Sequence, residues 1–357
     1  MKTLLENHRV IVCTGSGGVG KTTTAAALGV AAAQRGRRVL VLTIDPARRL
    51  ATTLGIARQL DDVRVAGQGY AGELWAGMID PPRVFTDYIR RYAADDAAAQ
   101  RVFDNALYRQ ISTTLSGSQE FTSLSRLHDA VESGKYDLVI LDTPPAAHAA
   151  DFLRAPERLN AVFDSTIVSM FMGRTSGFGL AAAAWKRSVK LLLGTLTLLT
   201  GSEFVANFSG FFSAIDAIAP AIRATNLAAH RLLLDPATAF VLITSFDAAK
   251  IREGEEFRDE LEDAGYHLRK VIVNRAWPAW AKGSKNATAA IERQLAALGQ
   301  PQLARLHSVL RDYYNQRQDA HTSFTDVFTV PEIDAEVIGL PALETLAAHL
   351  CPPRGRR

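Results

Sequence analysis

Short apolar runs alternate with segments of helical length along most of the chain. Continuous apolar runs of this kind indicate strands buried on both faces, as in a parallel sheet. They occur at residues 9–13, 38–44, 73–80, 136–142, 239–244, 271–273 and 328–331. Helices are predicted from Lys21 to before Gly36, within 83–134, at 247–264 and from Pro341. This alternation predicts an α/β fold, doubly wound around a mostly parallel sheet.

The alternation stops between residues 157 and 235, which are rich in Phe, Leu, Ala and Met. A spacing of i, i+4, i+7 and i+11 places apolar side chains on one face of a helix. The residues with this spacing are Phe204, Phe208, Phe211, Ile215, Ile218 and Ile222. We therefore predict an inserted α-helical subdomain at 157–235, between core segments at 1–156 and 236–350. Residues 351–357 form a basic tail.

Composition argues against several classes of protein. The net charge is only +3 over 357 residues, and the basic residues are dispersed apart from the tail, so we expect no nucleic-acid partner. No signal peptide precedes the first strand, and no uncharged apolar stretch reaches the roughly 18 residues of a spanning helix. Cys13 and Cys351, the two cysteines, provide no disulfide framework and no zinc site. These features predict a soluble cytoplasmic protein that is not itself transmembrane.

Residues 15–22, with the sequence GSGGVGKT, lie between the first predicted strand and the first long helix. Strand, glycine-rich loop and helix N-terminus form the context of a phosphate-binding loop, in which backbone N–H groups surround phosphate oxygens. Lys21 would neutralise the β- and γ-phosphates, and the Thr22 hydroxyl would ligate Mg²⁺. The predicted nucleotide-binding residues are Gly15, Ser16, Gly17, Gly18, Val19, Gly20, Lys21, Thr22 and Thr23. A chance glycine-rich turn is disfavoured because eight positions and both flanks fit.

Two aspartates follow predicted strands. Asp45 comes after the strand at 38–44, and Asp142 ends the apolar run LVIL in the manner of a Walker B strand. Ligands of open α/β sheets bind beyond the carboxyl ends of strands, so both carboxylates are expected near the phosphates. Asp142 would hold Mg²⁺ through water ligands. The alternative for Asp45 is that it only caps the helix that follows.

The loop resembles the deviant Walker A motif, GKGGVGKT, of the arsenical-pump (ArsA) and guided-entry (Get) ATPase family. Residues 45–50, DPARRL, resemble the family's switch I motif DPAHNL, and residues 142–148, DTPPAAH, resemble its switch II motif DTAPTGH. Asn274, at the end of the strand at 271–273, matches an asparagine that the family uses to recognise adenine. These motifs occur in family order over almost the whole chain. The resemblance implies a SIMIBI-type P-loop ATPase.

By this resemblance, Asp45 orients or deprotonates the attacking water and contacts the metal through water, with Lys21 as the other catalytic residue. The implied switch residues are Asp45, Pro46, Asp142, Pro145 and His148. The resemblance also implies that Asn274, Arg275 and Pro331 surround the adenine, although Asn274 by itself is equally compatible with a simple turn residue.

The family's signature lysine, which reaches the nucleotide of a dimer partner, is replaced by Ser16. A serine cannot stabilise charge on a γ-phosphate as a lysine does. The P-loop is not repeated, so the resemblance implies a dimer of two chains. We therefore expect ATP, ADP and Mg²⁺ as ligands, and either a homodimer or a heterodimer with a related ATPase that retains the lysine.

Three functions are compatible with these observations. The first is a dimeric ATPase that binds hydrophobic helices or a membrane protein partner and changes conformation on hydrolysis. The second is the ATPase subunit of an arsenite-type anion pump, which the shortage of thiolate ligands disfavours. The third is a nucleotide-binding regulatory subunit. Residues 157–235 fit a groove for apolar helices, as in the Get branch, but equally fit a subdomain whose apolar stripes bury one another.

Overall fold

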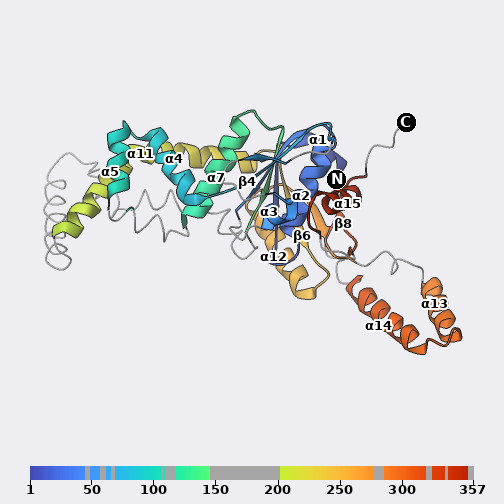
Figure 1. Cartoon of the computed structure of the whole chain (residues 1–357). Helices are drawn as coiled ribbons and strands as arrows, with labels where there is room; N and C mark the ends of the chain where they lie inside the picture. Colours follow the sequence, from blue (N-terminus) through green and yellow to red (C-terminus); the bar gives the residue numbers. More distant parts are fainter. Residues whose placement is uncertain are drawn as a thin grey trace. The chain divides into compact units, whose positions relative to one another are not determined.

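The computed structural model describes residues 1–44, 49–56, 62–65, 69–105, 108, 117–144, 202–276, 285–318, 324–333 and 337–352. The chain divides into two compact units (Figure 1). The first comprises Met1–Ile79, Asp129–Ala150 and Leu233–Arg357, and the second comprises Asp80–His128 and Asp151–Leu232. Of the predicted helical subdomain, residues 157–201 lie outside the described part of the chain.

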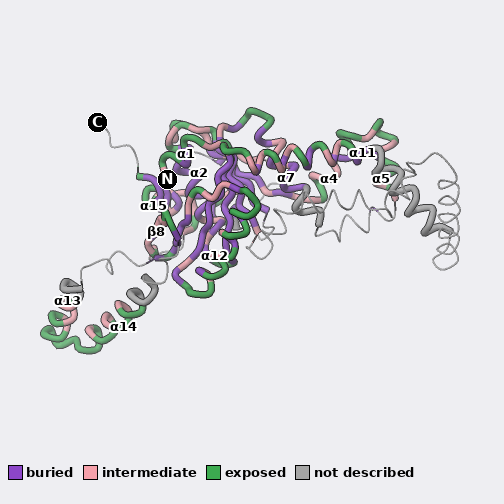
Figure 2. The backbone as a smooth tube through the Cα atoms, turned by 180° about the vertical axis from the view of Figure 1, so that it is seen from behind, coloured by how far each residue is buried: buried purple, intermediate pink, exposed green. Residues whose placement is uncertain are grey.

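In the described part of the first unit, eight strands form one sheet in the order β3-β4-β2-β5-β1-β6-β7-β8. β3 pairs with β4 in the antiparallel sense, and the remaining pairs are parallel. The strands are β1 (Val10–Gly15), β2 (Arg38–Thr43), β3 (Val63–Arg64), β4 (Glu73–Met78), β5 (Leu138–Asp142), β6 (Thr238–Thr244), β7 (Leu268–Val273) and β8 (Val327–Thr329). The central strands are buried along their whole length (Figure 2).

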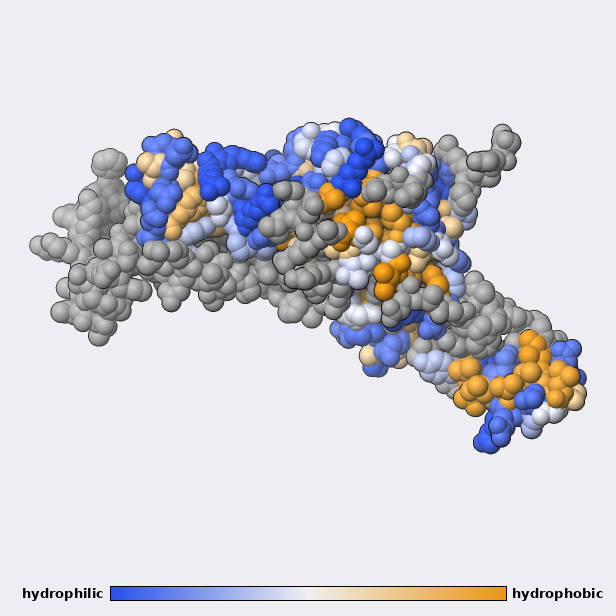
Figure 3. All heavy atoms as spheres, in the orientation of Figure 1, coloured by the Kyte–Doolittle hydropathy of each residue, from blue (hydrophilic) through white to orange (hydrophobic). Residues whose placement is uncertain are grey.

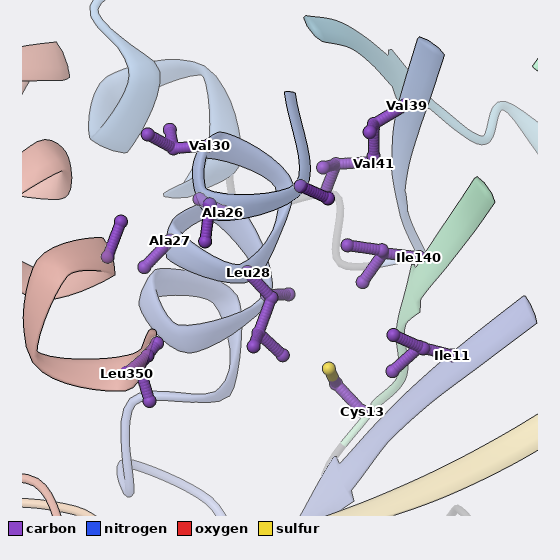
Figure 4. Close-up of a cluster of buried hydrophobic side chains, with 14 of the residues drawn as sticks. Ile11, Cys13, Ala26, Ala27, Leu28, Val30, Val39, Val41, Ile140 and Leu350 are labelled. Atoms are coloured by element: carbon purple, nitrogen blue, oxygen red, sulfur yellow. The ribbon is translucent and has the colours of Figure 1, made fainter. Parts of the chain in front are cut away.

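Helices cover both faces of this sheet. On one face, α2 (Lys21–Ala33) packs against the strands and against α15 (Leu340–Leu350). Leu28 of α2 faces the strand residues Ile11, Cys13 and Ile140 (Figure 4). On the other face, α12 (Ala248–Asp263) is so close that a Cβ added to Gly254 would lie 3.7 Å from Leu242 Cδ2. The predicted doubly wound α/β fold is therefore confirmed.

Alanines let α2 approach the sheet closely. Most of its residues are small, and all those between Thr24 and Ala33 are buried. A Cβ added to Gly29 would lie 2.6 Å from Val41 Cγ2, so even an alanine there would require a shift. The helix ends as its sequence predicts, because Gly36 adopts φ +93° just beyond it.

The second unit is helical in the residues that the structure describes. Its elements include α4 (Pro81–Tyr92), α5 (Asp96–Asp104), most of α7 (Gly117–Glu132) and most of α11 (Ser202–Leu234). Ile218 and Ile222 of α11 are buried with Tyr88 and Ile89 of α4, and the Tyr88 hydroxyl lies 3.0 Å from Thr225 Oγ1. At Ile218 and Ile222, the helical spacing of apolar residues seen in the sequence therefore corresponds to a buried face of α11.

The predicted strands and helices correspond to observed elements, with ends that differ by a few residues. The apolar patterns did not reveal β3, the short α1 (Lys2–Asn7), or the two helices α13 (Lys285–Ala297) and α14 (Pro301–Gln318). Placing Cys351 in the tail was wrong, because its side chain is 3% exposed and belongs to the core beneath α15.

Candidate nucleotide-binding site

The loop of residues 15–20 joins β1 to α2 and needs its glycines. Gly18 and Gly20 have φ of +79° and +89°, and Gly20 is the N-cap of α2. Gly15 has φ +143° and lies so near β6 that an added Cβ would be 1.9 Å from the Ile243 carbonyl oxygen. No other residue type fits at position 15, so the turn that opens the N-terminus of α2 depends on it.

Lys21, the first residue of α2, is folded back over the loop. Its side chain is almost buried, and Nζ donates a hydrogen bond of 2.8 Å to the backbone carbonyl oxygen of Ser16. Ser16 itself is only 2% exposed. The loop therefore contains a buried cation beside the N-terminus of a helix, which is an arrangement that attracts phosphate groups.

Asp142, the last residue of β5, makes hydrogen bonds to α2 and to β2. Its Oδ2 accepts hydrogen bonds from Thr22 Oγ1 at 2.7 Å and from Thr43 Oγ1 at 2.9 Å. In the sheet, Asp142 is paired with Cys13 on β1 and with Thr43 on β2. The carboxylate is buried, and a hydroxyl beside a carboxylate provides the hard oxygen ligands that Mg²⁺ prefers. Thr22 and Asp142 are thus adjacent, and their oxygen atoms are of the kind that holds a magnesium ion.

Thr43 was not recognised from the sequence as part of this site. It ends β2 two residues before Asp45, and its hydroxyl reaches Asp142 because the two strands are neighbours in register. The sequence offered one indication of this role, because Thr43 ends a buried strand just before the motif at residues 45–50. That indication could be interpreted only with the strand order, which the sequence did not provide.

Cys13 lies beneath the loop on β1. Complete burial, followed by the nearby Asp142 carboxylate, raises the pKa of its thiol well above the usual value. The thiol therefore stays protonated at neutral pH and is a poor ligand for soft metals or metalloids, which require thiolate. Cys351 is also buried.

Asn274, at the end of β7, contacts the loop directly. Its Nδ2 donates a hydrogen bond of 2.8 Å to the Val19 carbonyl oxygen, and the side chain is nearly buried. A Cβ added to Gly20 would lie 2.4 Å from this Nδ2. Asn274 therefore stabilises the backbone of the loop through Val19, and the sequence did not indicate this contact.

The residues after β7 and β8 lie next to each other. The Ala276 N–H donates to the Val330 carbonyl oxygen, and the Val330 N–H donates to that of Val273. Arg275 has φ +50° and is exposed, while Pro331 is half-buried. Asn274, Arg275 and Pro331 are therefore brought to one edge of the sheet.

Glu253 on α12 lies beside the loop and was also missed. Interaction with the Ser16 hydroxyl, and then with the Lys250 ammonium, holds the pKa of its carboxyl below the usual value. Lys250 Nζ lies 3.0 Å from Glu253 Oε2. A carboxylate therefore lies near position 16, where the sequence lacks the expected lysine, while the Ser16 hydroxyl makes no hydrogen bond of normal geometry to the described residues.

The sequence is similar to that of known proteins over most of its length. A model of the anion-transporting ATPases (ArsA_ATPase) matches residues 8–352. The chain belongs to this family. It is 24% identical to ATPase GET3 of Podospora anserina over 358 residues, which cover 99% of this chain and 94% of the relative. It is 22% identical to putative arsenical pump-driving ATPase 1 of Aquifex aeolicus over 347 residues, which cover 95% and 78% of the two chains.

A third relative, ATPase ASNA1 homolog 1 of Paramecium tetraurelia, is 29% identical over 160 residues. That match covers 44% of this chain and 46% of the relative. Members of the anion-transporting ATPase family are ATPases, so the prediction of a nucleotide-binding ATPase is confirmed.

Four predicted switch residues, Asp45, Pro46, Pro145 and His148, lie outside the described residues. Among the residues that are described, no three His, Cys, Asp or Glu side chains gather into a potential metal site. None of the described helices is both long enough and apolar enough to cross a membrane.

Proposed function

We propose that this family member binds ATP with Mg²⁺ in the loop of residues 15–22 and hydrolyses it. The observation that supports this most directly is the 2.7 Å hydrogen bond between Thr22 Oγ1 and Asp142 Oδ2. It joins the helix after the phosphate-binding loop to the end of β5, so the two groups expected to hold the metal are adjacent. ADP, the product, would remain in the same loop.

Each group has a distinct task in this proposal. The loop N–H groups of residues 15–23 and the Lys21 ammonium bind the phosphates, while Thr22 and water held by Asp142 position the metal. Bound Mg²⁺ would neutralise charge on the transferred phosphoryl group. Asp45 would orient the attacking water, and Asn274, Arg275 and Pro331 would border the adenine. Changes at Pro46, Pro145 and His148 would report the state of the nucleotide.

The coupled process is proposed to be the binding of hydrophobic helices or a membrane protein partner by a dimer. Full-length similarity to a relative named ATPase GET3 supports a function in this branch of the family. Another relative is named as arsenical pump-driving. Anion pumping of that kind is less well supported, because both cysteines are buried and the Cys13 thiol is held protonated.

Asp45→Asn tests the assignment of hydrolysis. We expect the Kd for ATP, measured by calorimetry with Mg²⁺, to stay within about threefold, because the side chain acts on water rather than on phosphate. Turnover should fall by about 10²–10⁴-fold, as for loss of a general base. The matched control is Asp263→Asn, which removes an exposed carboxylate at the end of α12 and should change neither quantity. Equal losses in affinity and turnover would instead make Asp45 a metal or structural residue.

A second candidate is a nucleotide-binding subunit of a heterodimer. The observation that favours it is the buried Ser16, since a serine supplies no cation to a neighbouring nucleotide. Cations supplied in trans accelerate related phosphoryl transfers by about 10³–10⁵-fold. A homodimer of this chain would therefore be a slow ATPase, and a partner that retains the lysine would complement it.

A further inference from the structure

Thr43, the last residue of β2, makes a hydrogen bond to the carboxylate that the proposed function assigns to the metal. Its hydroxyl donates to Asp142 Oδ2 at 2.9 Å, and the Thr22 hydroxyl donates to the same oxygen at 2.7 Å. Thr43 is 2% exposed and Asp142 is 1% exposed. One buried carboxylate oxygen thus accepts from two threonines, one on a strand and the other on the helix that follows the phosphate-binding loop.

The backbone holds the ends of β2 and β5 in a fixed register. Thr43 and Asp142 are paired residues of these parallel strands. Just beyond the pair, the Ile44 N–H donates to the Asp142 carbonyl oxygen at 3.2 Å, and the Thr143 N–H donates to that of Cys13 at 3.2 Å. Paired residues direct their side chains to the same face of a sheet. The strand geometry therefore keeps the Thr43 hydroxyl within reach of the carboxylate.

The two hydroxyls differ in what else they are expected to do. In the proposed function, the Thr22 oxygen becomes a ligand of Mg²⁺, so its position depends on the metal and the bound phosphates. Thr43 lies on a strand outside residues 15–23 and has no such task. Its bond to Asp142 can therefore persist with and without the metal. Residues that orient the groups around a metal in this way typically contribute about 10–100-fold to metal affinity.

We infer that Thr43 is a positioning residue, which holds the Asp142 carboxylate in the orientation that Mg²⁺ requires. The inference rests on the proposed function, since it takes Asp142 to hold the metal through water. It adds a residue that lies outside all the motifs at residues 15–22, 45–50 and 142–148. The alternative is that the hydroxyl only satisfies a buried carboxylate and stabilises the fold. The two roles differ in one measurable quantity, which is the effect of Mg²⁺ on nucleotide affinity.

The test measures this effect in the full chain without turnover. Calorimetry gives the Kd for the imido analogue of ATP, which is not hydrolysed, once with Mg²⁺ and once with EDTA. Thr43→Val keeps the shape of the side chain but removes the hydroxyl, and it should raise the Kd with Mg²⁺ by about 10-fold. The Kd with EDTA should not change, because the groups that bind the phosphates are intact. Thr43→Ser retains a hydroxyl and should restore tight binding with Mg²⁺.

Thr14→Val is the matched control. Thr14 is also a buried threonine near the end of a central strand, but its hydroxyl makes no hydrogen bond to the described residues. Its substitution should leave both Kd values unchanged. Thr43→Ala, which also lacks the hydroxyl, should give the same shift as Thr43→Val, and circular dichroism should show that all four variants are folded.

The outcomes separate this inference from the proposed function. If Mg²⁺ strengthens binding equally in Thr43→Val and in the wild type, the inference is overturned and the proposed function stands. A lower stability of Thr43→Val in urea, with that effect of Mg²⁺ unchanged, would assign the hydroxyl to the fold alone. Thr43→Ser that binds as weakly as Thr43→Val would also overturn the inference. A wild type whose affinity does not respond to Mg²⁺ would overturn the proposed function, and the inference with it.

Discussion

At the scale of single residues, the loop is shaped by contacts that come from distant parts of the sequence. Asn274 donates to the carbonyl oxygen of Val19, 255 positions away, and occupies the space beside Gly20. The motif match predicts that Asn274 contacts the adenine. Its position adds a second task, because the same amide holds the backbone of the phosphate-binding loop in place.

Asn274→Ala separates these two tasks. Removing the donor leaves the buried Val19 carbonyl oxygen without this partner, which should lower the free energy of unfolding by about 1–3 kcal/mol in the absence of nucleotide. The Kd for ATP and that for GTP should rise together, because the loop binds phosphates in both. Chemical denaturation and calorimetry measure these quantities. If the variant instead lost discrimination between ATP and GTP at unchanged stability, Asn274 would contact only the base.

At the scale of elements, an ionic contact holds the first residues of two neighbouring strands, β2 and β5, next to each other. Asp137, just before β5, accepts from the backbone N–H of Arg38 at 2.8 Å and from its guanidinium at 2.7 Å. These bonds join the starts of β5 and β2, whose ends carry Asp142 and Thr43. Hydrogen bonding and charge from Arg38 hold the pKa of the Asp137 carboxyl below its usual value.

Asp137→Asn should therefore destabilise the protein in a pH-dependent way. The pair is well exposed to solvent, so the loss at pH 7 should be at most about 1 kcal/mol. Because the folded-state pKa is depressed, the stabilisation is present above the unfolded pKa of about 3.9 and is lost as the pH falls through the lower folded value. Urea denaturation at pH 7 and below pH 4 should show the difference shrink. A difference independent of pH would exclude the ionic contribution.

At the scale of the whole molecule, we expect Ser16 to limit how rapidly the chain hydrolyses ATP by itself. The residue is buried in the phosphate-binding loop, and the Glu253 carboxylate stands beside it. A lysine placed at position 16 would therefore meet a carboxylate of its own chain as well as any nucleotide of a partner. The two interactions compete for the same ammonium group.

The prediction concerns Ser16→Lys, alone and combined with Glu253→Gln. If trans-activation limits turnover, Ser16→Lys should raise the ATPase rate of the purified chain toward the 10³–10⁵-fold effect of such cations. The double variant should be faster still, because Glu253 no longer retains the lysine. Ser133→Lys adds an exposed lysine elsewhere and serves as control. A wild-type chain that already matches the Ser16→Lys rate would remove the reason for a heterodimer.

Features encoded by neighbouring residues could be predicted from the sequence, whereas features that depend on residues far apart in the sequence could not. Buried strands such as β2 and β6 were predicted because continuous apolar runs reflect burial on both faces. Helices α13 and α14 were not predicted, although Leu303, Leu306 and Tyr313 recur at helical spacing; several of their apolar residues are exposed (Figure 3), and Glu292 pairs with Arg311 between the two helices. The short antiparallel β3 carries too few residues for any periodicity.

The sequence by itself determined the α/β class, the glycine-rich loop between β1 and α2, and the acidic end of β5 at Asp142, because each is encoded by neighbouring residues with fixed chemical requirements. Only the tertiary structure decided that Thr43 shares Asp142 with Thr22, that Asn274 supports Val19 and that Glu253 faces Ser16. These contacts join segments about a hundred or more positions apart. Strand order and register bring them together, and both depend on packing across the whole sheet rather than on any local pattern.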